Sequence, residues 1–315
     1  TGVKIDDFEI LRVMHNSTRS HVYLVKQLSS GQTMVLKTPS PNFADDTVYL
    51  EAFVREHWLG RQLDNPHIIK HFERPKDSQF LYSLSEYVEG QTLREWMIDN
   101  PKPRLESVRL MLESLVTGLR AMQRDGIVHR DIKPENIMID QHNRCKIIDL
   151  GAAIAPGLSE LASAVIEDAP MGDADYIAPE YLLGSAATVQ SDLYSLGCMI
   201  YEMLCGALPY QLELSPTKVP KSLNEWDYRS IRKQRPEIPI WVDVALQTAT
   251  AANPNQRYAA YSEFLQDMRK PGEVAIKRER AAPLIERYPQ KVWQGISALL
   301  AIIIAVQAYI ISQSP

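Results

Sequence analysis

The chain has 315 residues, of which 45% are hydrophobic and 23% are charged, and its formal net charge is −5 at pH 7. A chain of this length favours two globular units with an appendage, and this hydrophobic content is enough for a sizeable core. The acidic balance argues against a nucleic-acid-binding protein, because such proteins carry a strongly basic face.

The N-terminal part is predicted to be rich in β-structure. Apolar and polar residues alternate over residues 8–38, where a Ser-Ser-Gly turn at residues 29–31 separates two strands. Residues 47–63 carry apolar side chains at helical spacing, and short strands are expected near residues 68–73 and 80–84. We therefore expect a sheet accompanied by one helix in this part of the chain.

The following part, to about residue 270, is predicted to be mainly helical. Its clearest helices are residues 105–124 and 191–204, where apolar residues recur at steps of three and four. Residues 271–290 contain three prolines and several basic residues, and this composition predicts a linker.

The last apolar segment is predicted to be a transmembrane helix. Residues 292–311 contain no charged side chain, and ten of these twenty residues are Ile, Leu or Val. Twenty helical residues span about 30 Å, which is the thickness of one hydrocarbon core. Basic residues precede the segment, so the positive-inside rule places the preceding domain in the cytoplasm. The alternative is a buried helix of a soluble core, which the lack of a polar stripe disfavours.

The run His129-Arg-Asp-Ile-Lys-Pro-Glu-Asn136 is the most informative motif, and Asp149 follows it in Asp-Leu-Gly. Two carboxylates and an amide at these spacings are what phosphoryl transfer from Mg-ATP needs. Asp131 is expected to orient or deprotonate the substrate hydroxyl, and Asn136 and Asp149 are expected to hold Mg²⁺. Lys133 is placed to neutralise the transferred phosphoryl group. Each of these residues taken alone would be interpreted as a solvated loop residue.

This run resembles the catalytic loop of protein kinases, and the chain is similar to that family from about residue 8 to about residue 270. The resemblance implies an α+β, two-lobed fold with ATP and Mg²⁺ as cofactors, Mn²⁺ as an alternative metal, and proteins as substrates. Lys133 at its position marks Ser/Thr kinases within the family. The expected order is an N-lobe at 1–84, a hinge at 85–91, a C-lobe at 92–270, a linker at 271–290 and the transmembrane helix at 292–311.

The resemblance also assigns residues to nucleotide binding. Lys37 resembles the strand-borne lysine that contacts the α- and β-phosphates, and Glu56 on the helix that follows is its expected ion-pair partner. Taken alone, Lys37 would be interpreted as a solvated lysine at the end of a strand. In the hinge, adenine is expected to bond to the backbone of Glu86 and Val88.

Two further positions are expected to be structural. The resemblance pairs Glu180, in Ala-Pro-Glu, with Arg257 as a buried ion pair. It also assigns Asp192 to holding the catalytic loop. The alternative role for an aspartate at a helix start is an N-cap that satisfies unpaired backbone N–H groups, and the two roles are compatible.

The phosphate-binding loop departs from the family pattern, because His15, Ser17 and Ser20 occupy its three glycine positions, ahead of Val22. Glycine permits positive φ angles and close approach of backbone N–H groups to phosphates. One interpretation is a serine-rich loop that still functions. The alternative is a pseudokinase or nucleotide-binding scaffold. A small-molecule kinase is a third interpretation, which the Ala-Pro-Glu segment and the helical region after residue 220 disfavour.

The activation segment, between Asp149 and Glu180, contains no threonine. Asp173 stands where Ser/Thr kinases usually have a threonine, and we expect it to contact Lys133. Arg130 is expected to bind a carboxylate of this segment in place of a phosphate. The candidate carboxylates are Glu160, Glu167 and Asp168.

The resemblance narrows to the kinase part of bacterial fused phosphatase–kinase proteins, which place a metal-dependent phosphatase domain before the kinase. The serine-rich loop, residues 36–43, residues 283–287 and the terminal apolar segment carry this similarity. The chain begins at Thr1 without an initiator Met, so we expect a segment of a longer protein. The expected location is the inner (cytoplasmic) membrane, as a single-pass protein with the kinase facing the cytoplasm.

Overall fold

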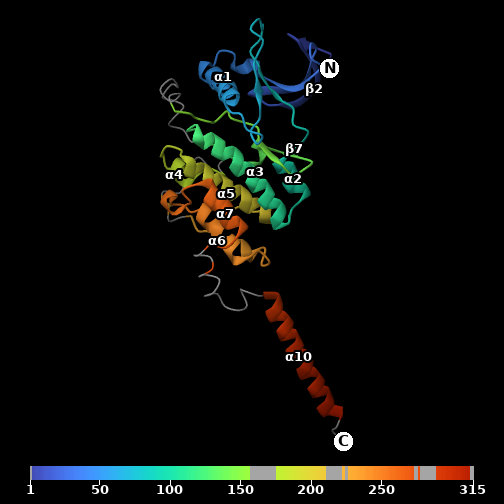
Figure 1. Ribbon diagram of the computed structural model, residues 1–315. Helices are drawn as coiled ribbons and strands as arrows, with labels where there is room; N and C mark the ends of the chain where they lie inside the picture. Colours follow the sequence, from blue (N-terminus) through green and yellow to red (C-terminus); the bar gives the residue numbers. More distant parts are fainter. Residues whose placement is uncertain are drawn as a thin grey trace.

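The computed structural model describes the backbone of residues 2–156, 175–210, 222–223, 226–272, 276 and 289–312. Figure 1 shows a β-rich part at the N-terminal end above a larger helical part, with α10 at the C-terminal end. This order is that of the α+β, two-lobed architecture expected from the sequence. The side chains of α10 are described for residues 291–304.

The N-terminal part is built on one six-stranded antiparallel sheet, in the order β1-β2-β3-β4-β6-β5. The strands are β1 (Lys4–Ile5), β2 (Phe8–Asn16), β3 (Ser20–Gln27), β4 (Thr33–Pro39), β5 (His71–Phe72) and β6 (Ser83–Glu86). Phe8, Val25, Leu36 and Tyr82 are buried on this sheet, as expected where apolar residues alternate along strands. The strands predicted within 8–38 are thereby confirmed, whereas the last strand begins at Ser83 rather than near residue 80.

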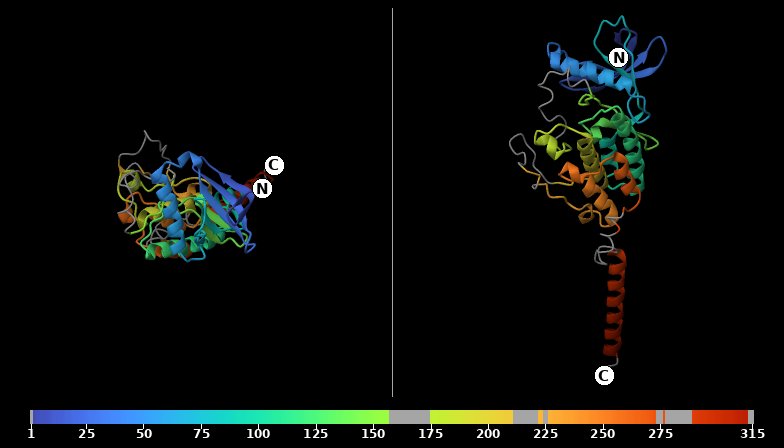
Figure 2. Two further views of the ribbon diagram at one scale, coloured as in Figure 1. Left: turned by 90° about the horizontal axis from the view of Figure 1, so that it is seen from above. Right: turned by 60° about the vertical axis from the view of Figure 1, so that its left-hand side comes forward.

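Helix α1 (Thr47–Gln62) packs against the sheet at strands β5 and β6 (Figure 2). Asp46 caps the helix, because its carboxylate accepts a hydrogen bond from the Tyr49 N–H at 2.9 Å. Phe53, Glu56 and Leu59 form its buried face. The helix predicted at 47–63 is thus confirmed.

The helical part contains α2 (Leu93–Asp99), α3 (Leu105–Arg124), α4 (Pro179–Leu182), α5 (Val189–Cys205), α6 (Ile240–Ala249) and α7 (Tyr261–Arg269). Among the residues that the structure describes, 3-10 turns lie at Pro41–Phe43, Pro134–Asn136, Ile231–Lys233 and Pro254–Gln256. A small sheet of β7 (Gly90–Thr92), β8 (Ile137–Asp140) and β9 (Cys145–Ile147) lies where the sequence predicted mainly helix. Strands of three or four residues are too short for their alternation to be distinguished from loop sequence.

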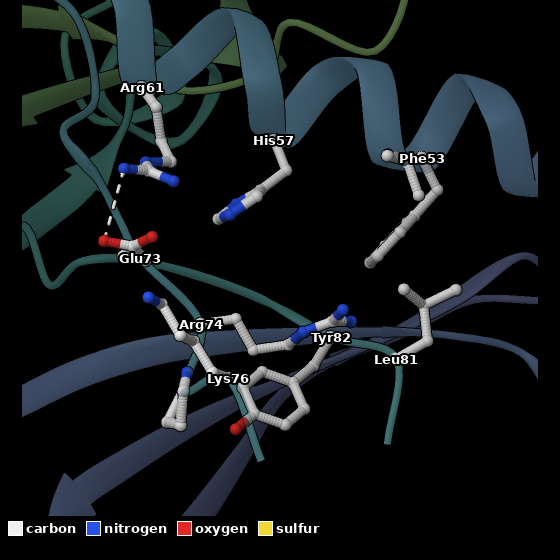
Figure 3. A pocket seen from close by; sticks show the side chains of 10 residues that line it. Phe53, His57, Arg61, Glu73, Arg74, Lys76, Leu81 and Tyr82 are labelled. Atoms are coloured by element: carbon white, nitrogen blue, oxygen red, sulfur yellow. Dashed lines mark ion pairs between the residues drawn. The ribbon is translucent and has the colours of Figure 1, made fainter. Parts of the chain in front are cut away.

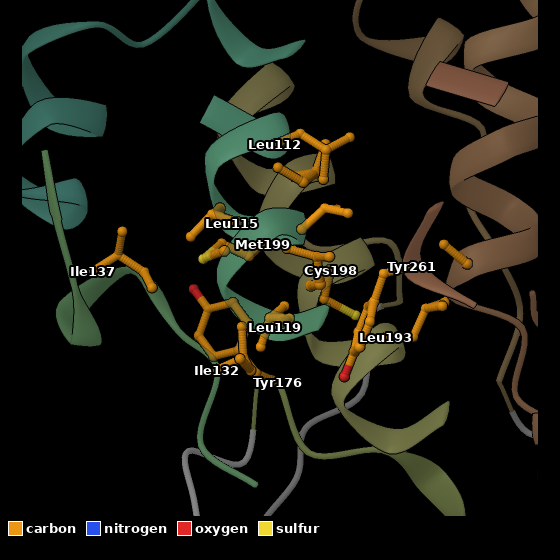
Figure 4. Close-up of a cluster of buried hydrophobic side chains, with 14 of the residues drawn as sticks. Leu112, Leu115, Leu119, Ile132, Ile137, Tyr176, Leu193, Cys198, Met199 and Tyr261 are labelled. Atoms are coloured by element: carbon orange, nitrogen blue, oxygen red, sulfur yellow. The ribbon is translucent and has the colours of Figure 1, made fainter. Parts of the chain in front are cut away.

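The core of the helical part lies between α3 and α5, as Figure 4 shows for Leu112, Leu115, Leu193 and Met199. Helix α5 is buried along nearly its whole length. A Cβ atom at Gly197 would lie 2.8 Å from Cγ2 of Thr250, so the glycine permits close packing of α5 against the end of α6. This packing fixes α5, and α5 in turn supports the loop that begins at His129.

Helix α10 (Pro289–Ser312) contains the segment predicted to cross a membrane. Over the residues that the structure describes, no helix combines the length and the apolar character needed to cross a bilayer. The side chains of residues 305–311 of the predicted segment lie outside the described part. Among those described, Trp293, Leu299 and Ile304 are more than half exposed.

A buried ion pair joins the end of the activation segment to the helical part. Both terminal nitrogens of Arg257 donate to the Glu180 carboxylate, at 2.7 and 2.6 Å. The Arg257 side chain is fully buried and lies over the Tyr194 ring, 4.9 Å from its centroid. This pair was expected from the sequence, and the structure confirms it.

We predict that Arg257→Leu lowers the free energy of unfolding by about 3–5 kcal/mol, because it leaves the Glu180 carboxylate buried without its countercharge. The matched control is Arg269→Leu, which removes a pair with Glu113 whose side chains are about half exposed and should cost less than about 1 kcal/mol. Urea unfolding of both variants measures the difference. Equal losses would contradict a special role for the buried pair.

Candidate active site

The catalytic loop is held in place by Asp192 of α5. Its carboxylate, which is 2% exposed, accepts hydrogen bonds from the backbone N–H of His129 at 2.7 Å and of Arg130 at 2.8 Å. Arg130 has a φ of 68°, in the left-handed region that a non-glycine residue rarely adopts. Two short bonds to a buried charge hold this strained backbone. Thr188 is the N-cap of α5, so the alternative interpretation of Asp192 as the N-cap is wrong.

Asp131, Lys133 and Asn136 converge in one cluster. The Lys133 ammonium lies 3.1 Å from Oδ2 of Asp131, and Nδ2 of Asn136 donates to the same oxygen at 2.8 Å. A second bond from Nδ2 to the Asp131 backbone carbonyl, at 2.9 Å, fixes the Asn136 amide. With its nitrogen committed to Asp131, this amide directs its oxygen the other way.

Lys37 on β4 and Glu56 on α1 form the expected ion pair. The Lys37 ammonium lies 2.9 and 2.8 Å from the two carboxylate oxygens of Glu56. Burial alone would lower the pKa of Lys37, but the charges of Glu56 and Asp149 raise it above its usual value. The lysine is therefore a fixed positive charge at neutral pH.

Asp149 lies beside this pair, and its Oδ1 accepts a hydrogen bond from the Gly151 N–H at 2.8 Å. Burial raises the pKa of a carboxyl group, but the Lys37 charge and this hydrogen bond together hold the pKa of Asp149 below its usual value. A carboxylate that stays ionised in a half-buried site is suited to binding a cation. Leu150, in the usual place of phenylalanine, is buried in the core of the helical part.

The phosphate-binding loop forms a turn between β2 and β3 that is stabilised by a serine side chain. The Ser17 hydroxyl donates to the Ser20 carbonyl and accepts from the Ser20 N–H, both at 3.0 Å. His15 and Val22 pair across the two strands. The non-glycine residues with positive φ in the described chain are Asp6, Arg130 and Asn143, so the loop keeps negative φ throughout. This turn therefore does not require the glycine backbone freedom that the family pattern supplies.

A second set of contacts ties the tip of this loop to α1. The Arg19 carbonyl accepts from the Tyr49 hydroxyl at 2.5 Å and from the Ser40 N–H at 2.7 Å. The Arg19 guanidinium lies over the Phe43 ring at 5.8 Å, and Phe43 packs on Tyr49 at 5.0 Å. Sequence reasoning did not identify Tyr49, because a bond from a helix residue to a loop 30 residues away has no local pattern.

The hinge runs from β6 to β7. The Glu86 carboxylate accepts from the Lys146 ammonium at 2.6 Å and from the Lys70 N–H at 2.8 Å, so the orientation of this side chain is fixed. The backbone of Val88 lies in the short connection before β7 begins at Gly90. Glu86 and Val88 are thus placed where the two parts of the molecule join, and their contact with adenine stays a prediction.

Arg94 of α2 links three segments around the catalytic loop, and sequence reasoning did not identify it. Its guanidinium contacts Glu135 of the loop at 2.6 Å, Glu202 of α5 at 2.7 Å and the Tyr176 hydroxyl at 2.6 Å. Tyr176 also donates to Glu202. The network joins residues far apart in sequence, so only the folded chain shows it.

The residues of the activation segment that were expected to contact Lys133 and Arg130 lie outside the described residues. These are Asp173, for which a contact with Lys133 was expected, and the carboxylates of Glu160, Glu167 and Asp168. Among the described residues, Nε of Arg130 donates to the Ala152 carbonyl at 2.6 Å. This bond attaches the guanidinium to the start of the activation segment.

Comparison with known proteins places the chain in a family. The family model described as "Protein kinase domain" matches residues 8–271, so the chain belongs to the protein kinase family. It is 30% identical over 264 residues to "Serine/threonine-protein kinase PrkC" of Bacillus subtilis, covering 83% of this chain and 40% of that protein. It is 29% identical to "Serine/threonine-protein kinase PknB" of Mycobacterium leprae, covering 84% of this chain and 42% of that protein. The chain thus spans about 40% of the length of these relatives.

Solved structures support the fold. The crystal structure of the PknI kinase domain of Mycobacterium tuberculosis matches with a TM-score of 0.64 at 23% identity, covering 85% of this chain and 97% of that one. At this identity the similarity shows the two-lobed architecture alone.

We predict that Tyr49→Phe weakens ATP binding about fivefold, since it removes one hydrogen bond worth about 1 kcal/mol from the loop that is expected to cover the phosphates. Calorimetric titration with ATP and Mg²⁺ measures the change. The matched control is Tyr201→Phe, which removes a similar bond to a backbone carbonyl in the helical part and should leave ATP affinity unchanged. A similar loss in both variants would show that the Tyr49 contact does not position the loop.

Proposed function

We propose that this protein is a Ser/Thr protein kinase that transfers the γ-phosphate of ATP to Ser or Thr hydroxyls of proteins. The observation that carries the proposal is the joint presence of two formed clusters, the Lys37–Glu56 pair and the Asp131–Lys133–Asn136 group. The first belongs to the nucleotide side and the second to the transfer side of a phosphoryl-transfer site. The names of the curated relatives support the same substrate class.

Each residue has a role that its surroundings favour. Asp131 accepts or orients the proton of the attacking hydroxyl, and Lys133, 3.1 Å from it, offsets charge on the transferred group. Lys37 binds the α- and β-phosphates, and Glu56 fixes its position. The substrate oxygen and the phosphate are thereby brought together in one orientation, which is the main contribution of kinases to this reaction.

Asn136 and Asp149 fit the donor set of a divalent cation. The Asn136 amide is fixed so that it offers its oxygen, and the low pKa of Asp149 keeps its carboxylate ionised. Mg²⁺ prefers one or two such oxygens together with phosphates and water. A bound metal would neutralise the phosphates, and Mn²⁺ is the alternative with the same ligand preference.

We predict that Asp131→Asn lowers phosphate transfer about 10²–10⁴-fold, because the base or orienting group is lost. The assay follows labelled phosphate from ATP into protein with Mg²⁺, and phosphoamino-acid analysis should find Ser and Thr rather than Tyr. Asp149→Ala should also abolish transfer. The charge-matched control is Asp99→Asn, which changes an exposed aspartate on α2 and should leave transfer unchanged.

A pseudokinase or nucleotide-binding scaffold is the second candidate function, and the observation that favours it is the glycine-free loop of Ser17 and Ser20. The same assay separates the two. Binding of ATP without transfer to any protein, in wild type as in Asp131→Asn, would support the scaffold. Transfer that is lost in the variant would exclude it.

We further propose that the apolar segment at 292–311 anchors the kinase to the inner (cytoplasmic) membrane, with the kinase on the cytoplasmic side. The support is the sequence: no charged residue in twenty, with basic residues before it. We also propose a phosphatase domain in the parent chain, supported by the resemblance to fused phosphatase–kinase proteins.

We predict that the full chain floats with lipid vesicles, whereas a chain ending at residue 290 stays in the protein fraction. Ile303→Lys places a charge at the segment's centre, which costs about 2.5–3.5 kcal/mol in a membrane, and should reduce flotation. Gln294→Lys, near the segment's end, is the matched control. Flotation of the shortened chain would contradict the proposed anchor.

A further inference from the structure

Two segments rich in basic residues meet at one end of the helical part. Residues 229–235 contain four cations and no acidic residue, and residues 101–105, between α2 and α3, contain two cations and no acidic residue. The segments lie side by side, because the Arg235 guanidinium donates to the Pro103 carbonyl at 3.2 Å. A chain whose net charge is −5 therefore gathers positive charge at this end.

Most of these cations face the solvent. Lys102, Arg104 and Lys233 are exposed, and Arg232 is half-buried. These four residues form what we call the basic surface. Arg104 is also the N-cap residue of α3, and its side chain makes no capping hydrogen bond. The unpaired N–H groups of a helix start carry partial positive charge, so the start of α3 adds to the potential of the basic surface.

The acidic residues that follow the two segments are bound to other cations. Glu106 lies 3.2 Å from Arg109, and Glu237 lies 2.6 Å from the buried Arg235. Each of these carboxylates thus has a cationic partner outside the basic surface, and the excess of positive charge remains.

The chain leaves the helical part at the same end. Nε of Arg109, in the second turn of α3, donates to the carbonyl of Met268 at the end of α7 at 2.7 Å. Figure 1 shows α6, which packs on α7, at the end of the helical part nearest α10. A flexible linker of about twenty residues spans about 25 Å on average. The apolar segment proposed to enter the membrane therefore begins close to the basic surface.

We propose that the basic surface binds the anionic head groups of the membrane that α10 enters, an inference that rests on the proposed membrane anchor. Lysine and arginine donate hydrogen bonds to phosphate oxygens. Each basic residue near an anionic leaflet strengthens its attraction about fivefold. A few such residues do not hold a protein on a membrane alone, so the basic surface orients a chain that α10 anchors.

This contact would fix the height of the active site above the membrane. Helix α3 runs for 20 residues from Leu105 beside the basic surface to Arg124, and the catalytic loop begins soon afterwards at His129. A helix of this length spans about 30 Å. With the basic surface on the head groups, Asp131 would lie about 30 Å from them and stay open to protein substrates.

Acetylation of lysines by acetic anhydride, followed for each residue by mass spectrometry, tests the contact in the full chain reconstituted into vesicles. We compare phosphatidylcholine alone with phosphatidylcholine that contains about one third phosphatidylglycerol. Lys102 and Lys233 should react at least about threefold more slowly in the anionic vesicles, because the head groups cover them. Salt at about 0.5 M should remove the difference.

A group of cations in the N-terminal part supplies the matched control. Figure 3 shows Arg74 and Lys76 beside the pocket next to α1, and Lys76 is exposed. Lys76 should react at the same rate in both kinds of vesicle. The variant Lys102→Gln/Arg104→Gln should return Lys233 to its rate in neutral vesicles, whereas Arg74→Gln/Lys76→Gln, which removes the same charge, should leave Lys233 slow.

Equal rates at Lys233 in the two kinds of vesicle overturn the proposal, and so does a slowing of Lys76 as large as that of Lys233. A slowing of Lys233 by soluble glycerol phosphate in neutral vesicles overturns the lipid surface as the partner. Thermal unfolding shows whether each variant is folded. A double variant that unfolds is replaced by Arg104→Gln alone, with the same criteria.

Flotation of the full chain on neutral vesicles separates this proposal from the anchor on which it rests. A chain that does not float disproves the anchor, and the basic surface as an orienting contact fails with it. A chain that floats but shows equal lysine rates disproves the basic surface alone. Neither result depends on phosphate transfer, so the proposed kinase activity stands or falls by its own assay.

Discussion

The rest of the site depends on one buried carboxylate, Asp192. It is fixed on α5, which is buried along nearly its whole length, and it accepts the two backbone N–H groups that begin the catalytic loop. A charge that is 2% exposed is stable only if it is compensated. Here the compensation includes the two backbone N–H groups of the loop, one of which belongs to Arg130 with its left-handed backbone. The hydrophobic core of the helical part is therefore connected directly to the geometry of Asp131.

In the N-terminal part, α1 likewise positions a charged side chain of the site, Glu56. Glu56 reaches Lys37 from α1, which packs on the sheet through a short buried face. Within that face Gly60 carries no side chain, and His71 fills the gap with two ring nitrogens that lack partners among the described residues. Burial, with the charges of His57 and Lys37, lowers the pKa of His71 to about 3, so the ring is neutral. A polar ring without hydrogen bonds stabilises a helix interface less than an aliphatic side chain does. The α1 interface is thus weaker than the α3–α5 core, and the position of Glu56 is the easier one to change.

Much of the fold was predictable because its signals are local. Alternation over 8–38 and helical spacing at 47–63 identify the sheet and α1, and the pairs of Lys37 with Glu56 and of Glu180 with Arg257 follow from fixed motifs. The small sheet of β7, β8 and β9 was missed, since its strands are too short to show a period. The contacts of Tyr49, Arg94 and His71 were also missed. The contacts of Tyr49 with Arg19, of Arg94 with Glu202 and of His71 with Gly60 join residues 11 to 108 positions apart, and a single sequence carries no record of such proximity.

The phosphate-binding loop between β2 and β3 departs from the family pattern because it has no glycine, and the structure shows how the turn forms without one. Glycine in such a loop allows positive φ and close approach to phosphate, but this turn has neither glycine nor positive φ, and the Ser17 hydroxyl closes it instead. A side chain that completes a turn also stiffens it, because its own hydrogen bonds must break before the loop can open. Through Arg19 and Tyr49 the loop is further attached to α1. The loop of Ser17 and Ser20 and the Lys37–Glu56 pair are therefore not independent, because both are bonded to the same helix. A displacement of α1 would move this loop and the partner of Lys37 together.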